Sequence, residues 1–239
     1  MVITFAALCF FAIVQSVYGV GLLVFGTPYL ILNNSGFDEA LGILLPSSFL
    51  ISIHQVLVHR NVVIQETKSF FPVMVGLPLG LTLTLKFDHD TNIMPILGVT
   101  LLIAAFIRSN RQSSLYLSQA FKNNKLKFHL LNSFIHGASN FGGALLPVYS
   151  SSVHNEKLCA LKCTSVFYSI YSGTQIFVLI LLQKSEVFRD GLIFMPVCLF
   201  CYWIAGRHAI KVVSQQLFDR LAIAFFWCIG LVFLARSFV

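Results

Sequence analysis

Long stretches of this chain carry no charge at all: no Asp, Glu, Lys or Arg occurs from Met1 to Phe37. Over the 239 residues, charged side chains make up 10% and hydrophobic ones 57%, whereas soluble domains carry roughly 25% charged residues. Such a chain cannot cover a globular surface with side chains that water solvates. A soluble enzyme and a DNA-binding domain are therefore excluded, and we predict an all-α, polytopic integral membrane protein.

The apolar residues fall into eight segments, and a helix needs about 20 apolar residues to cross a bilayer. The segments lie at about 2–32, 40–58, 70–87, 92–108, 128–151, 157–183, 190–206 and 212–236. A basic stretch at 109–127 divides them into two sets of four. We therefore predict a first membrane repeat at 1–108, a basic cytoplasmic linker at 109–127 and a second membrane repeat at 128–239.

Matched residues indicate that the two halves are homologous. Gly19 pairs with Gly137, Pro28 with Pro147, Ala40 with Ala160, Ser52 with Ser172 and Gln55 with Gln175, in the same order and at a nearly constant offset. Duplicated halves with a binding site between them are typical of secondary transporters.

Segments one and five contain helix-weakening residues at mid-depth. Segment one has three glycines and a proline between Gly19 and Pro28, and segment five has Asn140 with Gly142 and Gly143. One interpretation is that both segments are broken or re-entrant helices whose free backbone groups and half-helix N-termini face a buried anion. The other is close helix packing through small residues.

The distribution of cations bears on topology. The 16 Lys and Arg outnumber the 9 Asp and Glu, and we attribute the excess to cytoplasmic loops beside anionic lipid rather than to nucleic-acid binding. Eight full crossings put ten cations on one side and six on the other, whereas re-entrant segments one and five give twelve and four. The second arrangement, with inverted halves, fits the positive-inside rule better.

Several motifs resemble those of a known family. The run Gly19-Val-Gly-Leu-Leu-Val-Phe-Gly-Thr-Pro28, followed by Glu39-Ala40, is similar to the first-half signature of the TauE/SafE sulfite and organosulfonate exporters, also called the toluene-sulfonate uptake permease family. Asn140-Phe-Gly-Gly-Ala-Leu-Leu-Pro147 and Lys162-Cys-Thr-Ser165 resemble its second-half pattern. The first half departs from that pattern, since Ile43-Leu44 stands where the Thr-Ser element would fall. The resemblance implies a permease for sulfite, sulfonates or related anions.

Polar side chains line one face of two segments. Ser48, Ser52 and Gln55 are spaced i, i+4 and i+7, and Thr164, Tyr168, Ser172 and Gln175 continue the same helical spacing on segment six. Polar groups at membrane depth are costly without a partner, water or substrate. They either donate to a substrate or bond across helices and back to carbonyls.

These observations define a candidate substrate site between the repeats and no catalytic or metal site. Its residues are Gly21, Gly26, Ser52, His54, Gln55, Asn140, Gly142, Gly143, Thr164, Ser172 and Gln175. His54 is the titratable group that we place well inside a span, as a structural residue or a proton carrier. Cys198 and Cys201 form a CxxC, for which small buried residues are favoured over a redox pair or a zinc site.

We therefore expect a secondary transporter of small sulfur-containing anions, working by alternating access without a cofactor, in a cell membrane such as the bacterial inner membrane. Its partners are the anion and the lipid bilayer, and a homo-oligomer is compatible with the sequence. The alternatives are a transporter of another small anion or metabolite, a membrane partner subunit without transport, and a membrane-embedded enzyme. The seven histidines are scattered along the chain, which argues against an enzyme.

Overall fold

The computed structural model describes residues 2–59, 70–87, 94–154 and 156–237, and every regular element in these ranges is helical. The α-helices are α1 (Val2–Tyr18), α2 (Leu22–Leu32), α3 (Phe37–Val58), α4 (Phe70–Phe87), α5 (Met94–Ser109), α6 (Arg111–Asn123), α7 (Lys125–Ser139), α8 (Leu146–Val153), α9 (Lys157–Leu181), α10 (Phe188–Cys201), α11 (Arg207–Val212) and α12 (Gln215–Ser237). The other elements of the described ranges are two short 3₁₀ helices, η2 (Phe141–Ala144) and η3 (Ser185–Val187), and a π-helical turn, η4 (Tyr202–Gly206).

Several helices are suited to a membrane. Among the described residues, four spans are long and apolar enough to cross one: 37–58, 157–181, 185–206 and 219–237. Shorter apolar helices cover 3–18, 22–32, 70–86 and 94–109. The predicted all-helical membrane class is confirmed. Residues 60–69, in the loop expected between the segments at 40–58 and 70–87, lie outside the described residues. So do residues 92 and 93, at the start of the segment expected at 92–108.

Each of the two glycine-containing segments is a pair of helices that folds back on itself. In the first hairpin, the Phe11 ring of α1 lies 6.2 Å from the Phe25 ring and 5.9 Å from the Tyr29 ring of α2. In the second, Phe128 near the start of α7 stacks on Tyr149 of α8 at 4.8 Å. These cross-contacts make the helices of each pair antiparallel.

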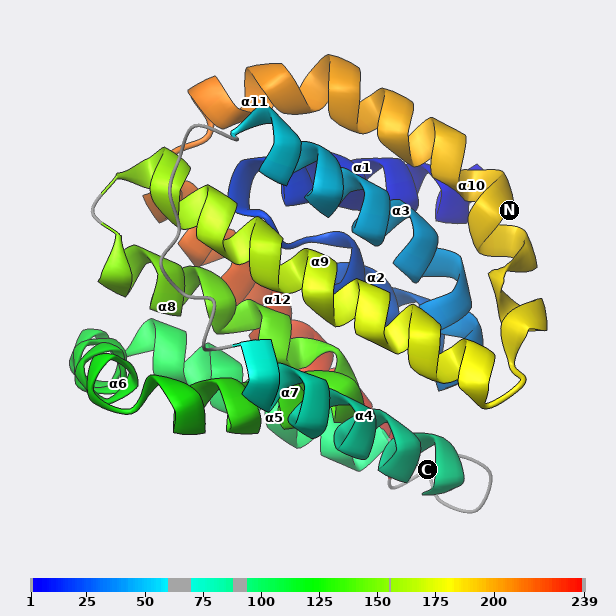
Figure 1. Ribbon diagram of the computed structural model, residues 1–239, viewed down its shortest axis with the longest axis horizontal. Coiled ribbons are helices and arrows are strands. Elements are labelled where there is room, and N and C mark those ends of the chain that lie inside the picture. The colour runs from blue at the N-terminus through cyan, green and yellow to red at the C-terminus, as the bar shows by residue number, and fades with distance from the viewer. Residues whose placement is uncertain (1, 60–69, 88–93, 155, 238–239) are drawn as a thin grey trace.

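Antiparallel pairs also join the halves of the chain. Figure 1 shows α3 and α9 side by side at the centre, with α10 along one edge and α4 along the other. Ser165 near the start of α9 bonds to Gln55 near the end of α3, while Gly173 further along α9 faces the earlier Phe49. At the periphery α5 packs against α12. These two helices are also antiparallel, because Gly98 near the start of α5 faces Leu234 near the end of α12.

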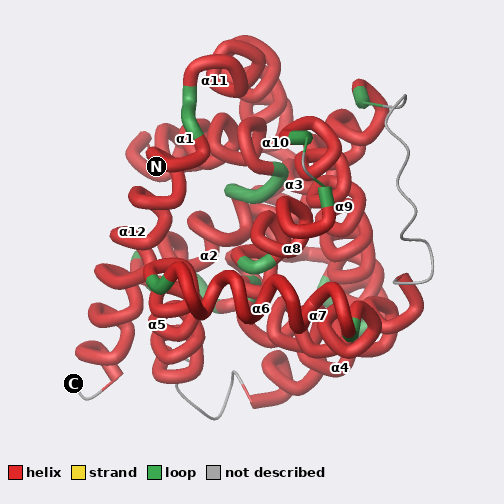
Figure 2. The backbone as a smooth tube through the Cα atoms, turned by 90° about the vertical axis from the view of Figure 1, so that its left-hand side faces the viewer, coloured by secondary structure: helices red, strands yellow, loops and turns green. Residues whose placement is uncertain are grey.

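The basic stretch between the halves is itself helical. Asn110 caps α6, because its side-chain oxygen accepts hydrogen bonds from the backbone N–H groups of Gln112 and Ser113 at 2.9 and 3.3 Å. Figure 2 shows α6 running across the ends of its neighbours rather than along them. The predicted linker 109–127 therefore holds α6 and the first turn of α7.

Glycines bring α4 and α7 into backbone contact. A Cβ at Gly80 would lie 2.1 Å from Phe134 O, and one at Gly137 would lie 2.2 Å from Leu77 O. We expect Gly80→Val to push the two helices apart and to lower stability by about 3 kcal/mol, seen as a lower melting temperature in detergent. Gly173→Ala is the matched control, because its Cβ would meet only the edge of the Phe49 ring. Equal melting temperatures for the two variants would contradict this packing.

Candidate functional site

The first break is organised by Gln15. Gly19 follows α1 with φ +73°, a conformation that glycine adopts at little cost. The Gly19 N–H still donates to Gln15 O at 2.9 Å, and the Leu22 N–H at the start of α2 donates to Gln15 Oε1 at 3.2 Å. One residue thus serves both the end of α1 and the beginning of α2.

The polar face predicted on α3 holds this break in place. Gln55 Nε2 donates to Gln15 O at 3.0 Å and to Ser16 O at 3.1 Å, and Gln55 Oε1 accepts from Ser165 Oγ of α9 at 2.9 Å. Gln15 Nε2 in turn donates to Ser52 Oγ at 3.1 Å. All five side chains are buried, so α3 supplies the partners that the interrupted helix lacks.

The second break has the same construction. Asn140 follows α7 with φ +64°, its N–H donates to His136 O at 2.7 Å, and the Gly143 N–H donates to His136 Nδ1 at 3.0 Å. Asn140 is therefore the structural counterpart of Gly19. The sequence-based partner, Gly137, lies three residues earlier and packs against α4 instead.

Other glycines of the breaks allow the two arms of each hairpin to touch. A Cβ at Gly21 would lie 2.5 Å from Gln15 N, and one at Gly142 would lie 2.3 Å from Asn132 O. The helices are therefore broken at these glycines, as the first interpretation expects, and small residues also permit backbone contact, as the second expects; whether the breaks face an anion stays a prediction.

The two hairpins meet at Asn140. Its Nδ2 donates to Thr27 Oγ1 of α2 at 2.8 Å, and its Oδ1 accepts from Gln175 Nε2 of α9 at 2.8 Å. All three residues are fully buried. We call the contact among Asn140, Thr27 and Gln175, together with the adjoining Gly143, the hairpin crossing.

The other predicted site residues lie around this centre or away from it. Ser172 donates to Tyr168 O within α9, Thr164 donates to Ser150 Oγ of α8, and Gly26 packs against Leu44. His54 directly precedes Gln55 but lies on another face of α3, where its Nδ1 is 3.0 Å from Tyr202 Oη of the π-helical turn. The crossing therefore contains the predicted residues Asn140, Gly143 and Gln175, Gly142 packs against α7 next to it, and Gly21, Ser52 and Gln55 gather at the first break.

Sequence reasoning missed Gln15, His136 and Thr27. Gln15 and Thr27 lie in apolar runs with no polar residue four positions away on either side, whereas His136 continues a helical spacing with Asn132 and Asn140 that the sequence analysis did not use. A usable signal exists for two of them, because Gln15 and His136 both stand four residues before the residue of positive φ. His54 is also not the most deeply buried histidine, since His129 and His136 are 0% exposed.

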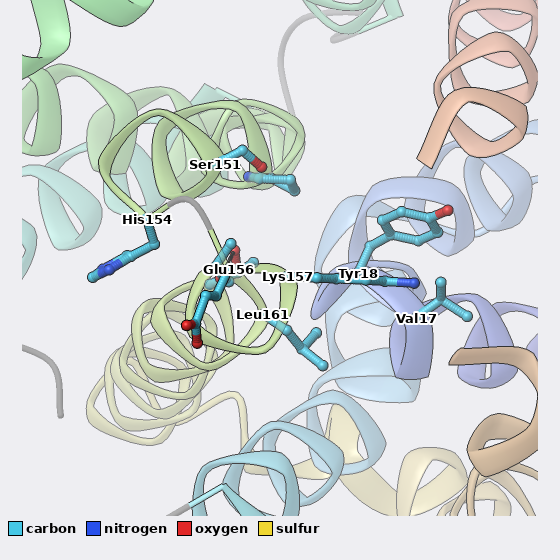
Figure 3. Close-up of a pocket in the computed structure, with 10 residues that line it drawn as sticks. Val17, Tyr18, Ser151, His154, Glu156, Lys157 and Leu161 are labelled. Atoms are coloured by element: carbon cyan, nitrogen blue, oxygen red, sulfur yellow. Dashed lines mark hydrogen bonds between the residues drawn. The ribbon is translucent and has the colours of Figure 1, made fainter. Parts of the chain in front are cut away.

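A cavity of about 230 Å³ opens beside the first break. It is lined by the end of α1, by α8 and by the start of α9, and Figure 3 shows Tyr18, Ser151 and Lys157 around it. Thr164 at its inner wall is also next to Gly19, whose Cβ would lie 3.0 Å from Thr164 Cγ2. The cavity therefore lies next to the first break.

Cations gather at this end of the molecule. The pKa of His59, which follows α3, is lowered first by burial and then by the positive charge of Lys162 at the start of α9. Arg108 at the end of α5 is deeply buried, where it donates to Ala144 O at the end of η2 and to Asp219 at 2.8 Å. Within the described ranges, no group of three His, Cys, Asp or Glu side chains is arranged to hold a metal ion.

Comparison with family models gives a match that spans almost the whole chain. The model of the family described as sulfite exporter TauE/SafE matches residues 4–233. No curated protein and no solved structure matches.

Proposed function

We propose that this chain, which belongs to the TauE/SafE sulfite exporter family, is a multi-pass permease that moves sulfite, organosulfonates or related small sulfur-containing anions across the cytoplasmic membrane. One observation carries the proposal: in a chain of this family, the hydrogen bonds of Asn140 join two broken helices at the buried centre.

The arrangement supports alternating access around the hairpin crossing. The two breaks share one construction, and the long helices α3 and α9 run in opposite directions between them. Inverted halves around a central site formed by discontinuous helices are typical of secondary transporters. We therefore propose that residues 1–108 and 128–239 are inverted repeats that rock about this site.

The breaks suit an anion because they present helix N-termini. The first turn of α2 lies beside the crossing, and although Gln15 Oε1 accepts a hydrogen bond from its Leu22 N–H, the N-terminal end of a helix carries partial positive charge. Gly21 flanks this turn, and Asn140, Gly142 and Gly143 belong to η2 or flank it. Serine and glutamine side chains position the turns rather than project freely toward a substrate.

The cavity is proposed as the access route from the cytoplasm. The elements at its end of the molecule, α6, α11 and the starts of α7 and α9, carry Arg111, Lys122, Lys125, Lys127, Lys157, Lys162, Arg207 and Lys211. The positive-inside rule places such an end in the cytoplasm. Export of one negative charge from a cell that is negative inside releases about 2.3 kcal/mol per 100 mV, so ion coupling is not required.

Lys157 at the mouth of this cavity should raise the local anion concentration. We expect Lys157→Gln to raise the KM for anion uptake about two- to fivefold at low ionic strength and to have little effect at high salt, since salt screens exposed charges. Lys86→Gln, which removes an exposed cation at the opposite end of the molecule, is the control. A salt-independent effect, or an equal effect of both variants, would contradict a role for Lys157 in capture.

Thermal unfolding of the detergent-purified protein tests the substrate class. The panel contains sulfite, thiosulfate, taurine, other sulfonates and sulfate, with chloride and simple cations as controls. A ligand at 100 times its dissociation constant stabilises a protein by roughly 2.7 kcal/mol, which raises the melting temperature measurably. We expect stabilisation by sulfur oxyanions alone, and an equal response to chloride would refute the proposed selectivity.

A further inference from the structure

One face of α5 is apolar and exposed along most of the helix. Ile96, Val99, Ile103 and Phe106 recur at intervals of three or four residues and are 46–59% exposed. Leu101 on the opposite face is 0% exposed. Exposed apolar patches mark surfaces that contact a membrane or a partner, and on a helix of a multi-pass membrane protein this patch faces acyl chains. We call the four exposed residues the α5 stripe.

The α5 stripe leads into a groove at the junction of α5 and α6. The groove has a volume of about 410 Å³ and is lined by Phe106 and Ile107 of α5 and by Gln112, Ser113 and Tyr116 of α6. Its apolar wall continues the stripe, because Phe106 belongs to both. Its other wall carries an amide, a hydroxyl and a phenol, each of which can donate a hydrogen bond to an oxygen anion. We call it the elbow groove.

The elbow groove lies at the depth where a membrane meets water. Figure 2 shows that α6 crosses the ends of the neighbouring helices, so it runs along the membrane surface. Tyr116 is 78% exposed, and Trp227 Nε1 of α12 donates to Ser109 Oγ at the end of α5 at 3.4 Å. Tyrosine and tryptophan are enriched at membrane–water interfaces. The apolar wall therefore lies at acyl-chain depth and the polar wall at headgroup depth.

The charge of this surface favours an acidic headgroup. Residues 91–155 contain no Asp or Glu, whereas residues 108–127 contain five Lys and Arg. Arg108 is paired with Asp219, but Lys125 and Lys127, just after α6, are exposed. Basic segments beside a membrane attract anionic lipid headgroups. A zwitterionic headgroup gains much less from such a surface, because its own cation is repelled.

We propose that the elbow groove binds one acidic phospholipid. An acyl chain lies along the α5 stripe, and the phosphate of the headgroup accepts hydrogen bonds from the polar wall of the groove. Since α6 joins the two halves of the chain, the bound lipid holds this connection at the membrane surface. The binding of the lipid does not depend on which anion the protein carries.

Fluorescence quenching in bilayers tests for this lipid. The chain has two tryptophans, so full-length Trp203→Phe protein retains only Trp227, whose indole lies beside Ser109 at the elbow. The protein is reconstituted in phosphatidylcholine with increasing amounts of brominated phosphatidylglycerol, and in the reverse mixture. Quenching of Trp227 then gives the ratio of the two binding constants. We expect phosphatidylglycerol to bind about five- to tenfold more tightly.

Gln112→Glu and Gln119→Glu, each made in the Trp203→Phe protein, form a matched pair. Both glutamines are exposed on α6, and both substitutions add one negative charge to this helix. Gln112 lines the groove, whereas Gln119 lies about 10 Å further along the helix, beyond the Debye length of about 8 Å at physiological salt. We expect Gln112→Glu to lower the preference about fivefold and Gln119→Glu to change it less than about twofold. An acid in the first turn of a helix is favourable, so Gln112→Glu should leave α6 folded.

Each contrary result removes a different part of the proposal. Equal binding of the two lipids in the Trp203→Phe protein would overturn the selectivity for an acidic headgroup. An unchanged preference in Gln112→Glu, or an equal loss in Gln119→Glu, would overturn the placement in the elbow groove. Quenching of Trp227 by neither brominated lipid would mean that a second copy of the chain covers the elbow, which also overturns it. None of these results involves transport, so the lipid site and the permease proposal fail separately.

Discussion

Replacing Gln55 by leucine is expected to give the largest loss of stability in the protein and to abolish transport. The amide of Gln55 donates to two backbone carbonyls at the end of α1, those of Gln15 and Ser16, and accepts from Ser165. Leucine removes all three hydrogen bonds, although Gln15 O keeps its bond from the Gly19 N–H and Ser165 Oγ keeps its bond to Leu161 O. At about 1–2 kcal/mol for each lost bond, the cost is about 3–6 kcal/mol.

Two measurements check this result: thermal unfolding in detergent and anion uptake into proteoliposomes at equal protein insertion. Ser172→Ala is the control, because the Ser172 hydroxyl bonds only to carbonyls of its own helix, those of Tyr168 and Ser169. We expect Ser172→Ala to behave like the wild type in both assays. A Gln55→Leu protein with wild-type melting temperature would show that the first break does not depend on α3.

The second large effect is expected at Asn140, where backbone and side-chain roles can be separated. Asn140→Gly keeps the left-handed conformation at little cost but loses the bonds to Thr27 and Gln175. Asn140→Ala loses the same bonds and adds about 1–2 kcal/mol of left-handed strain. Both variants should lose most transport activity, and alanine should melt at the lower temperature.

A double-mutant cycle tests whether Asn140 couples the hairpins. Thr27→Val removes the acceptor on α2 while preserving side-chain shape. If the 2.8 Å hydrogen bond joins the hairpins, the combined variant Asn140→Gly/Thr27→Val should be less destabilised than the sum of the single variants, by about 1 kcal/mol. Strict additivity would mean that the two residues act independently.

Much of the fold and part of the site could be predicted from the sequence. The scarcity of charge fixes the membrane class, because no soluble surface can be built from these residues. Glycine and Asn140 mark the breaks because they tolerate positive φ, and the spacing of Ser52, Gln55 and Gln175 places them on buried helix faces. These features are local, so a pattern of residues reveals them.

The remaining features depend on contacts between distant segments. Gln15 has no periodic polar companion, and although His136 is spaced with Asn132 and Asn140, only the folded hairpins show that Gln15 and His136 each bond the backbone N–H seven residues later. For the same reason, the sequence predicts Gly137 rather than Asn140 as the counterpart of Gly19. A glycine needed for close packing and a residue needed for a turn cannot be told apart in the sequence. The family match implies an exporter of sulfite or related anions.

Uptake of radiolabelled sulfite and methanesulfonate into proteoliposomes, with an imposed membrane potential, tests the central claim most directly. If a sulfur oxyanion passes through the hairpin crossing, wild-type protein should carry both anions faster when the interior is positive, and Asn140→Gly should carry neither. Uptake that is equal in Asn140→Gly and wild type, or that matches protein-free liposomes, would contradict the account.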